Sequence, residues 1–360
     1  MTEESLAMFG PGRVLTLDTN DGRRLDFTVD RLFTPVTKSV VVVARCDELG
    51  PGPVVLKIYD PRFNNERNGY ESKFGWRKPS HPWSLAAERA APATFDSKAI
   101  HRPEPAADDP AGQSERAAIW EAHLRHLMEE SFWYERAAYD NLRDLQGGAI
   151  PRLLAEGRLI PPDERAYVPR ALVLEYIDGV TLRQAPLELL TPAVGVALVR
   201  AVESFAAHGV FHHDLNPGNV LVTADGRGVV VDFGCAGVRN AENVWTDEDW
   251  AQHMDAVDEG NAIRFMFQRK GVDCSGELRP RWRHFDVKTG SWVDVVEGEI
   301  VVEGDSETAV KGETAVEGEA VVEGEARNAG LVGLTANAGS FGETADAGVV
   351  GFTCATDEVA

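Results

Sequence analysis

Three polar side chains capable of joint chemistry stand close together in the chain. Asp214 and Asn219 lie in HHDLNPGNVLV (212–222), and Asp232 lies in VVVDFG (229–234). One carboxylate can orient a hydroxyl nucleophile, while an amide and a second carboxylate can hold a metal ion on a polyphosphate. The spacing therefore indicates phosphoryl transfer to a hydroxyl group. An ordinary hairpin with capping acids is the alternative interpretation of the same letters.

Turn signals around these residues predict the elements that position them. A helix that ends at Gly209 precedes the first acidic residue, because glycine tolerates the positive φ of the position after a helix. The runs 220–222 and 229–231 predict two short strands joined by a hairpin turn. Asp232 is therefore expected at a strand end, beside Asn219.

A single lysine interrupts an apolar strand upstream. Lys57 stands in PVVLKIYD (53–60), and an enclosed ammonium group needs a partner. The long amphipathic helix predicted over 114–145 carries two acids that are candidates for this partner, Glu130 and Glu135, and Glu135 lies next to the apolar stripe of the helix. A strand-edge lysine with its head in water and a solvent-facing glutamate are the alternatives.

These motifs and their order along the chain resemble those of the protein kinase superfamily, which includes aminoglycoside and choline phosphotransferases. The motifs are LKIYDPRF, a long insertion, LQGGAIP and DFG, and the resemblance spans residues 25–272. The arrangement is most similar to the divergent kinase-like proteins common in fungi. An uncharged residue two positions after the first aspartate is more like the small-molecule branch of the superfamily.

This resemblance implies a role for each polar residue. Asp214 would act as the catalytic base, and Lys57, paired with Glu135, would contact the α- and β-phosphates of ATP. Asn219 and Asp232 would hold Mg²⁺. The implied cofactors are therefore ATP and Mg²⁺. The implied reaction moves the γ-phosphate to a hydroxyl acceptor, either a protein serine or threonine or a small molecule.

The resemblance also implies an adenine pocket at LEYIDG (174–179). Leu174 would lie at its back, and the backbones of Glu175 and Ile177 would meet the adenine edge. A plain strand-to-turn transition explains the same letters.

The loop expected to cover the phosphates departs from the kinase pattern. Kinases usually have a glycine-rich turn there, whereas residues 31–46 contain no glycine, and Pro35 removes one N–H donor. Thr37, Lys38 and Ser39 remain as phosphate contacts. A pseudokinase that acts as a nucleotide-binding or inert scaffold is therefore the second interpretation. The intact set of lysine, amide and acids favours an active enzyme.

We expect an α+β, bilobal protein kinase-like fold. A small N-lobe with an antiparallel sheet is predicted over 1–177, and a helical C-lobe over 178–293. The hydrophobic content of the 360-residue chain, 43%, is sufficient for a buried core. Residues 62–113 interrupt the N-lobe and are predicted to be a tolerated surface loop. Its first half is expected to pack on the surface of the small lobe, and its second half is expected to be mobile. A role in substrate specificity is the alternative.

Residues 294–360 differ in composition from the rest of the chain. They hold 15 acidic and 2 basic side chains and repeat the pattern V-(E/K)-G-(E/D). Repulsion among the acidic side chains and sparse burial of apolar side chains predict a disordered tail. Binding of protein partners by this acidic tail is a possible role. The formal net charge of −22, without an evident basic face, argues against nucleic-acid binding.

The remaining features concern the compartment. Four cysteines show no spacing typical of zinc sites or disulfide frameworks, so we expect a reducing compartment, the cytoplasm or nucleus. No run of eighteen apolar residues and no apolar N-terminal segment is present, so we expect a soluble protein that does not enter a membrane.

Overall fold

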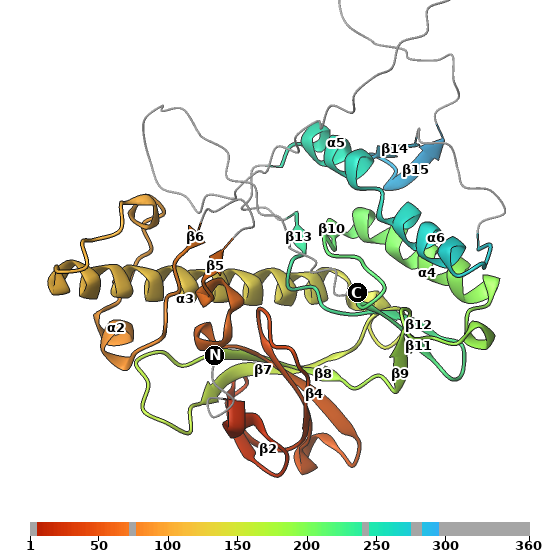
Figure 1. The fold of residues 1–360 in the computed structure, drawn as a ribbon. Coiled ribbons are helices and arrows are strands. Elements are labelled where there is room, and N and C mark those ends of the chain that lie inside the picture. The colour runs from red at the N-terminus through yellow and green to blue at the C-terminus, as the bar shows by residue number, and fades with distance from the viewer. Residues whose placement is uncertain (1–5, 72–76, 240–244, 275–282, 295–360) are drawn as a thin grey trace, which may run out of the picture.

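Six antiparallel strands form a closed barrel in the N-terminal half of the chain (Figure 1). The structure is a computed structural model that describes residues 6–71, 77–239, 245–274 and 283–294. In spatial order the strands are β1 (Val14–Thr19), β2 (Arg24–Leu32), β3 (Val40–Arg45), β4 (Pro53–Tyr59), β8 (Arg170–Glu175) and β7 (Leu153–Ile160). Two short 3-10 helices precede β1 and β4: η1 (Ala7–Phe9) and η2 (Asp47–Leu49).

Alternating burial explains why these strands close around one core. In β2, the buried residues Leu25, Phe27 and Val29 alternate with exposed neighbours, as expected for a strand with one face on the core. Strand β1 pairs with both β2 and β7, so these six strands leave no edge unpaired. An antiparallel sheet was predicted here, but β1 and the closure of the barrel were not.

The helix α3 (Pro110–Asn141) lies against β4 and β8, across the barrel (Figure 1). The Asp109 side chain caps its N-terminus by accepting a hydrogen bond from the amide of Gly112 at 2.9 Å. The helix was predicted over 114–145. It begins earlier because of this cap, and its predicted last residues form the 3-10 turn η6 (Arg143–Leu145).

The described residues of 62–113 form short elements. These elements are η3 (Pro61–Phe63), η4 (Asn65–Arg67), β5 (Tyr70–Glu71), β6 (Arg77–Lys78), α2 (Leu85–Ala90) and η5 (Ala99–His101). Of these, η3, α2 and η5 contact α3. Buried Arg67 pairs with Glu121 of α3, and Arg116 of α3 donates to the carbonyl of Ala99 at 3.0 Å. Packing was expected for the first half of this insertion, where Arg67 lies. The segment around Ala99, in the half expected to be mobile, is also held by a buried arginine of the helix.

The C-terminal half combines helices with short strands. Its described helices are η7 (Leu187–Leu189), α4 (Pro192–Phe205), η8 (Ala206–His208), α5 (Asp247–Val257) and α6 (Glu259–Arg269). A three-stranded sheet contains β9 (Gly179–Thr181), β11 (Val220–Thr223) and β12 (Gly228–Val230), and two pairs contain β10 (Val210–Phe211) with β13 (Gly237–Val238) and β14 (Arg283–Asp286) with β15 (Ser291–Asp294). The architecture is therefore a mixed one, with a sheet-rich N-terminal region followed by helices.

Two further packing features matter for the site. Helices α4 and α6 contact one another, and α4 also covers β12 (Figure 1). The hairpin β14–β15 lies on α5, where Phe285 packs with Trp250, Met254 and Phe211. Since Phe211 immediately precedes His212, this small core supports the segment that carries Asp214.

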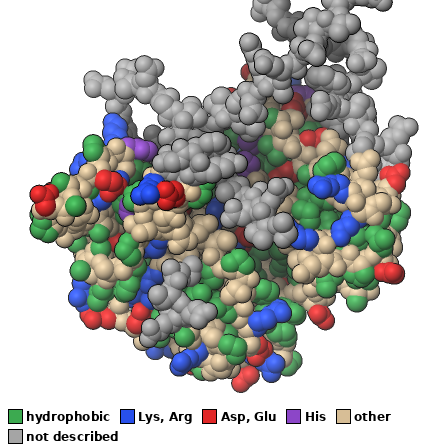
Figure 2. All heavy atoms as spheres, in the orientation of Figure 1, with side chains coloured by type: hydrophobic (Ala, Val, Ile, Leu, Met, Phe, Trp, Pro, Cys, Tyr) green, Lys and Arg blue, Asp and Glu red, His purple; other side chains and the backbone are tan. Residues whose placement is uncertain are grey.

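The predicted disordered tail, 294–360, lies outside the described residues except for Asp294, which is the last residue of β15. Within the described part of the chain, no helix combines the length and the apolar character needed to cross a bilayer. On the face shown in Figure 2, acidic and basic side chains are interspersed.

Candidate active site

The segment from His212 to Asn219 holds Asp214 through its own side chains. The Nδ2 of Asn219 donates to the carbonyl oxygen and to Oδ2 of Asp214, at 2.8 and 3.2 Å. The Nδ2 of Asn216 donates to Asp214 Oδ1 at 3.3 Å, and Asn216 Oδ1 accepts from the amide of Gly218 at 2.8 Å. Two amide groups therefore orient the half-buried carboxylate. Upstream, Gly209 has the predicted positive φ of 68° and directs the chain into this segment.

Glu259, at the start of α6, holds the same segment from the C-terminal region. Its Oε2 accepts from the amide of His212 at 2.9 Å, and its Oε1 accepts from the amide of His213 at 2.7 Å. Sequence reasoning missed this residue, because an acid in the first turn of a helix is normally explained by the helix dipole. Only the packing of α6 against the 212–219 segment shows that Glu259 also binds its backbone amides.

Lys57 connects the barrel to the segment around Asp232. Its Nζ donates to Asp232 Oδ1 at 2.6 Å and also forms an ion pair with Glu135 of α3. The Oε2 of Glu135 also accepts from the hydroxyl of Tyr59 at 2.6 Å. The lysine is therefore buried and paired, and its partner in the structure is Glu135. Glu130, the second candidate, lies 3.4 Å from His126 instead.

Opposing effects set the charges of this group. Desolvation disfavours the ammonium of Lys57, but the charges of Asp232 and Glu135 outweigh it and raise its pKa. Burial also opposes ionisation of Asp232, yet Lys57 lowers its pKa to about 2. Burial raises the pKa of Glu135, and Lys57 opposes this. One ammonium therefore serves two carboxylates, and an incoming phosphate would compete with Asp232 for it.

Asp232 and Asn219 lie on adjacent pieces of backbone. The amide of Val231 donates to the carbonyl oxygen of Asn219 at 2.9 Å, and the carbonyl of Val231 lies 3.0 Å from His212 Nε2. Asp232 itself has a positive φ of 68°. The strands β11 and β12 therefore bring the Asp214 loop and Asp232 to the same place, as their hairpin predicted.

Backbone strain is concentrated at this place. Among the described residues, only three other than glycine have positive φ: His213, Asp232 and Asp258. The first follows His212, the second carries the carboxylate bound to Lys57, and the third precedes Glu259. Such conformations cost about 1–3 kcal/mol each and persist at functional sites where the surrounding structure imposes them.

The donor set fits a hard divalent cation. Asp232 Oδ2 and Asn219 Oδ1 have no hydrogen-bond partner within the described residues, and the Asp232 side chain is 51% exposed. No group of three histidine, cysteine or acidic residues in the described ranges could hold a metal ion by itself. A cation here would therefore take most of its oxygens from phosphates and water, which is how Mg²⁺ is usually bound.

The segment predicted to meet adenine follows β8 directly. Leu174 is buried near the end of that strand, and the amide of Glu175 donates to the carbonyl of Arg152 at 2.9 Å. The Glu175 N–H is thus already paired. The backbone N–H and C=O of Ile177 make no hydrogen bond within the described residues. Of the two residues predicted to contact the adenine edge, Ile177 therefore has both its N–H and its C=O available for hydrogen bonds with a ligand.

The loop between β2 and β3 reaches the Asp-Phe-Gly segment. Lys38 Nζ donates to the Sγ of Cys235 at 2.8 Å, and Cys235 follows Gly234 directly. The carbonyl of Thr37 accepts from the amide of Asn65 at 2.7 Å, and Ser39 is half-buried beside it. Lys38 therefore lies at the segment that carries Asp232, whereas Thr37 is held by the insertion.

Comparisons with known proteins match the same region. A family model described as "ABC1 atypical kinase-like domain" matches residues 164–250, which include Asp214, Asn219 and Asp232. The probable serine/threonine-protein kinase PknB of Lactococcus lactis is 38% identical over 76 residues, 18% of this chain and 11% of the relative. The serine/threonine-protein kinase PknD of Mycobacterium tuberculosis is 37% identical over 91 residues, 23% of this chain and 14% of the relative. The chain is similar to the kinase-like superfamily.

A longer match has no activity in its name. The uncharacterized protein sll0005 of Synechocystis is 29% identical over 128 residues, 34% of this chain and 18% of the relative. The chain thus spans less than a fifth of the length of each of these relatives. These matches support the general kinase-like resemblance. They do not show the fungal or aminoglycoside-phosphotransferase features that the sequence suggested.

Proposed function

We propose that this protein is an ATP- and Mg²⁺-dependent phosphotransferase with a bilobal kinase-like fold, in which residues 1–177 form the N-lobe and 178–293 the C-lobe. The observation that carries the proposal is the junction between Lys57 and Asp232 at 2.6 Å. It joins a strand of the barrel to the hairpin that also carries Asn219. Kinase-like enzymes need this convergence, because their catalysis consists largely of positioning and electrostatic stabilisation.

Each residue then has a defined task. Asp214 orients the acceptor hydroxyl and takes its proton as the oxygen bonds to the γ-phosphorus and the bond to ADP breaks. Lys57 positions the α- and β-phosphates, and Glu135 holds Lys57 in place. Asn219 and Asp232 would hold Mg²⁺, which supplies charge neutralisation on the phosphates when bound. Within the described residues, the open backbone groups of Ile177 suit the edge of the adenine ring.

A pseudokinase is the second candidate. The loop between β2 and β3 has no glycine, and its Thr37 and Lys38 already make protein contacts. Both features oppose a close approach of this loop to phosphates. In a scaffold, Lys57, Asp214, Asn219 and Asp232 would bind nucleotide without transfer of its γ-phosphate, or would bind no nucleotide.

Thermal-shift titration with ATP, with and without Mg²⁺, tests the proposal together with an assay of ATP turnover on hydroxyl acceptors. Ligand binding stabilises a protein by about 2.7 kcal/mol at a hundredfold excess over Kd. We expect a shift that depends on Mg²⁺, together with turnover. A shift without turnover would indicate a nucleotide-binding scaffold. No shift at millimolar Mg-ATP would indicate an inert one.

A further inference from the structure

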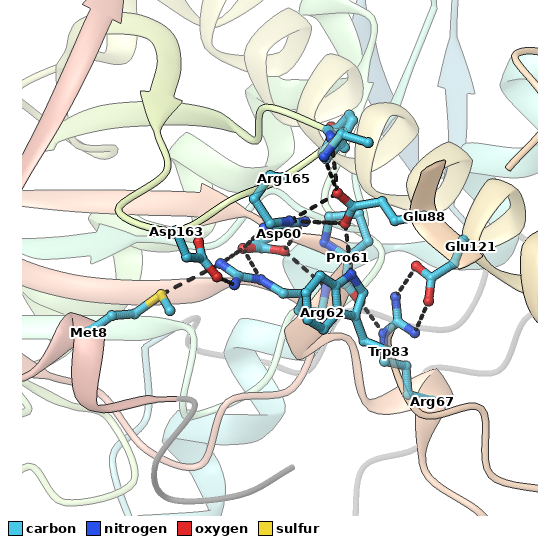
Figure 3. Close-up of polar contacts among 12 residues, drawn as sticks. Met8, Asp60, Pro61, Arg62, Arg67, Trp83, Glu88, Glu121, Asp163 and Arg165 are labelled. Carbon is cyan, nitrogen blue, oxygen red and sulfur yellow. Dashed lines mark hydrogen bonds and ion pairs between the residues drawn. The ribbon is translucent and has the colours of Figure 1, made fainter. Parts of the chain in front are cut away.

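A second cluster of buried charges begins three residues after Lys57 (Figure 3). Asp60 follows β4 and is fully buried. Arg165, from the connection between β7 and β8, binds both carboxylate oxygens of Asp60, with Nη1 donating to Oδ2 at 3.0 Å and Nη2 donating to Oδ1 at 3.2 Å. Arg62 donates to the same carboxylate at 2.7 Å. The end of the strand that carries Lys57 is thus anchored by two guanidinium groups.

The same arginine reaches the insertion. Arg165 Nε donates to Glu88 of α2 at 2.9 Å, and its side chain is only 1% exposed. Glu88 also accepts from the amides of Ala166 and Tyr167, at 2.7 and 3.0 Å, and from the indole of Trp83 at 2.7 Å. Arg165 therefore links strand β4, helix α2 and its own connection in one buried network (Figure 3).

Two neighbours of Arg165 extend this network to α3. The hydroxyl of Tyr167 donates to Glu129 Oε1 at 2.8 Å, and Arg170 Nε donates to Glu129 Oε2 at 2.5 Å. The guanidinium of Arg170 also lies over the rings of Phe132 and Trp133, at 5.0 and 4.6 Å from their centroids. These contacts cover the helical turn that immediately precedes Glu135.

We propose that the connection between β7 and β8, with Arg165 at its centre, is a clamp that fixes β4 relative to α3. In this clamp, Arg165, Tyr167, Arg170 and Glu129 are positioning residues for the Lys57–Glu135 pair. The inference rests on the proposed function of that pair. It assigns the described part of the insertion to the clamp, through Glu88, rather than to substrate specificity.

The consequence concerns regulation. Glu129 lies six residues before Glu135, and Asp60 lies three residues after Lys57, so each end of the clamp holds one member of the pair. The network binds both elements through protein contacts alone. We therefore expect the pair to form in the protein without nucleotide and without a partner protein that positions α3.

Glu129→Gln is the main test, because Arg165→Met removes the guanidinium that the buried carboxylates of Asp60 and Glu88 share and risks unfolding. We expect Glu129→Gln to weaken Mg-ATP binding about tenfold in the wild-type background and not further in a Glu135→Gln background. This non-additivity marks an effect transmitted through Glu135. Equal losses in both backgrounds would overturn the clamp, since a merely structural effect adds.

Arg116→Met is the matched control. Arg116 is a buried arginine of α3 that holds the insertion through Ala99, Ile100 and Glu104, without contacting β4 or Arg165. We expect it to change Mg-ATP affinity less than twofold. A loss as large as that of Glu129→Gln would refute a specific role for the clamp.

Hydrogen exchange separates failure of the clamp from failure of the proposed function. Amides in 130–141 of α3 should exchange about tenfold faster in Glu129→Gln than in Arg116→Met, whether or not nucleotide binds. Unchanged exchange in both variants would overturn the clamp. Faster exchange in Glu129→Gln alone, with no Mg-ATP binding by wild type, would uphold the clamp and refute the proposed function.

Discussion

Two charged clusters lie three residues apart along the chain at β4, and they differ in how completely their polar groups are paired. Around Asp60, both carboxylate oxygens have partners, and the Asp60 and Arg165 side chains are 0% and 1% exposed. Around Lys57, Glu135 Oε1 has no partner within the described residues, and Asp232 is half-exposed in a positive-φ conformation. Complete pairing suits rigid support, and incomplete pairing suits a site that takes ligands.

The largest expected effect is on turnover, and it would distinguish a catalytic residue from the residues that support the fold. Asp214→Ala should reduce turnover by about 10²–10⁴-fold, because it removes a positioned acid–base group. Its melting temperature and Mg-ATP affinity should remain close to those of wild type. Steady-state kinetics with a hydroxyl acceptor would check the first expectation. Turnover equal to that of wild type would rule out the proposed mechanism.

The converse effect is expected in the Asp60 cluster. Arg165→Met should lower the free energy of unfolding by about 3–5 kcal/mol, because it removes the buried guanidinium that two buried carboxylates, Asp60 and Glu88, share. Urea unfolding followed by fluorescence would measure the loss. A change below about 1 kcal/mol would contradict the contrast between the clusters, since exposed ion pairs contribute no more than that.

Two buried tyrosines provide a smaller and matched comparison. Tyr59 donates to the Glu135 carboxylate at 2.6 Å, whereas the hydroxyl of Tyr139 has no partner within the described residues. Tyr59→Phe should cost about 1.5–3 kcal/mol, because its hydrogen bond is to a charged group, and Tyr139→Phe should be neutral or stabilising. Thermal unfolding of both variants would check this. Equal losses would show that the hydroxyl of Tyr59 is not a special support of the pair.

The smallest expected effect is a pH dependence. The pKa of Asp232 is lowered to about 2 in the folded state from 3.8, so its pairing with Lys57 stabilises the protein above pH 3.8. This contribution is lost as the pH falls through 2. The stability difference between wild type and Asp232→Asn should therefore shrink between about pH 4 and pH 2, as measured by chemical denaturation. A constant difference would show that the pair does not favour the ionised carboxylate.

Local patterns were sufficient to predict much of the candidate site. The hairpin of β11 and β12 and the positive φ of Gly209 follow from turn chemistry. The choice of Glu135 as the partner of Lys57 followed from the kinase resemblance of a helix that periodicity predicts. The roles of these residues in catalysis stay predictions. The mixed architecture, sheet-rich before helix-rich, was confirmed. Cap chemistry at Asp109 was overlooked, so the start of α3 was placed too late.

The sequence by itself determined the elements and the chemical inventory of the site, because these depend on neighbours within a few residues. Tertiary structure decided the closure of the barrel, the support of the Asp214 loop by Glu259 and the network around Asp60. Arg165 lies 105 residues from Asp60, and Glu259 lies 47 residues from His212. Pairing over such separations depends on how whole elements pack, and no local pattern specifies it.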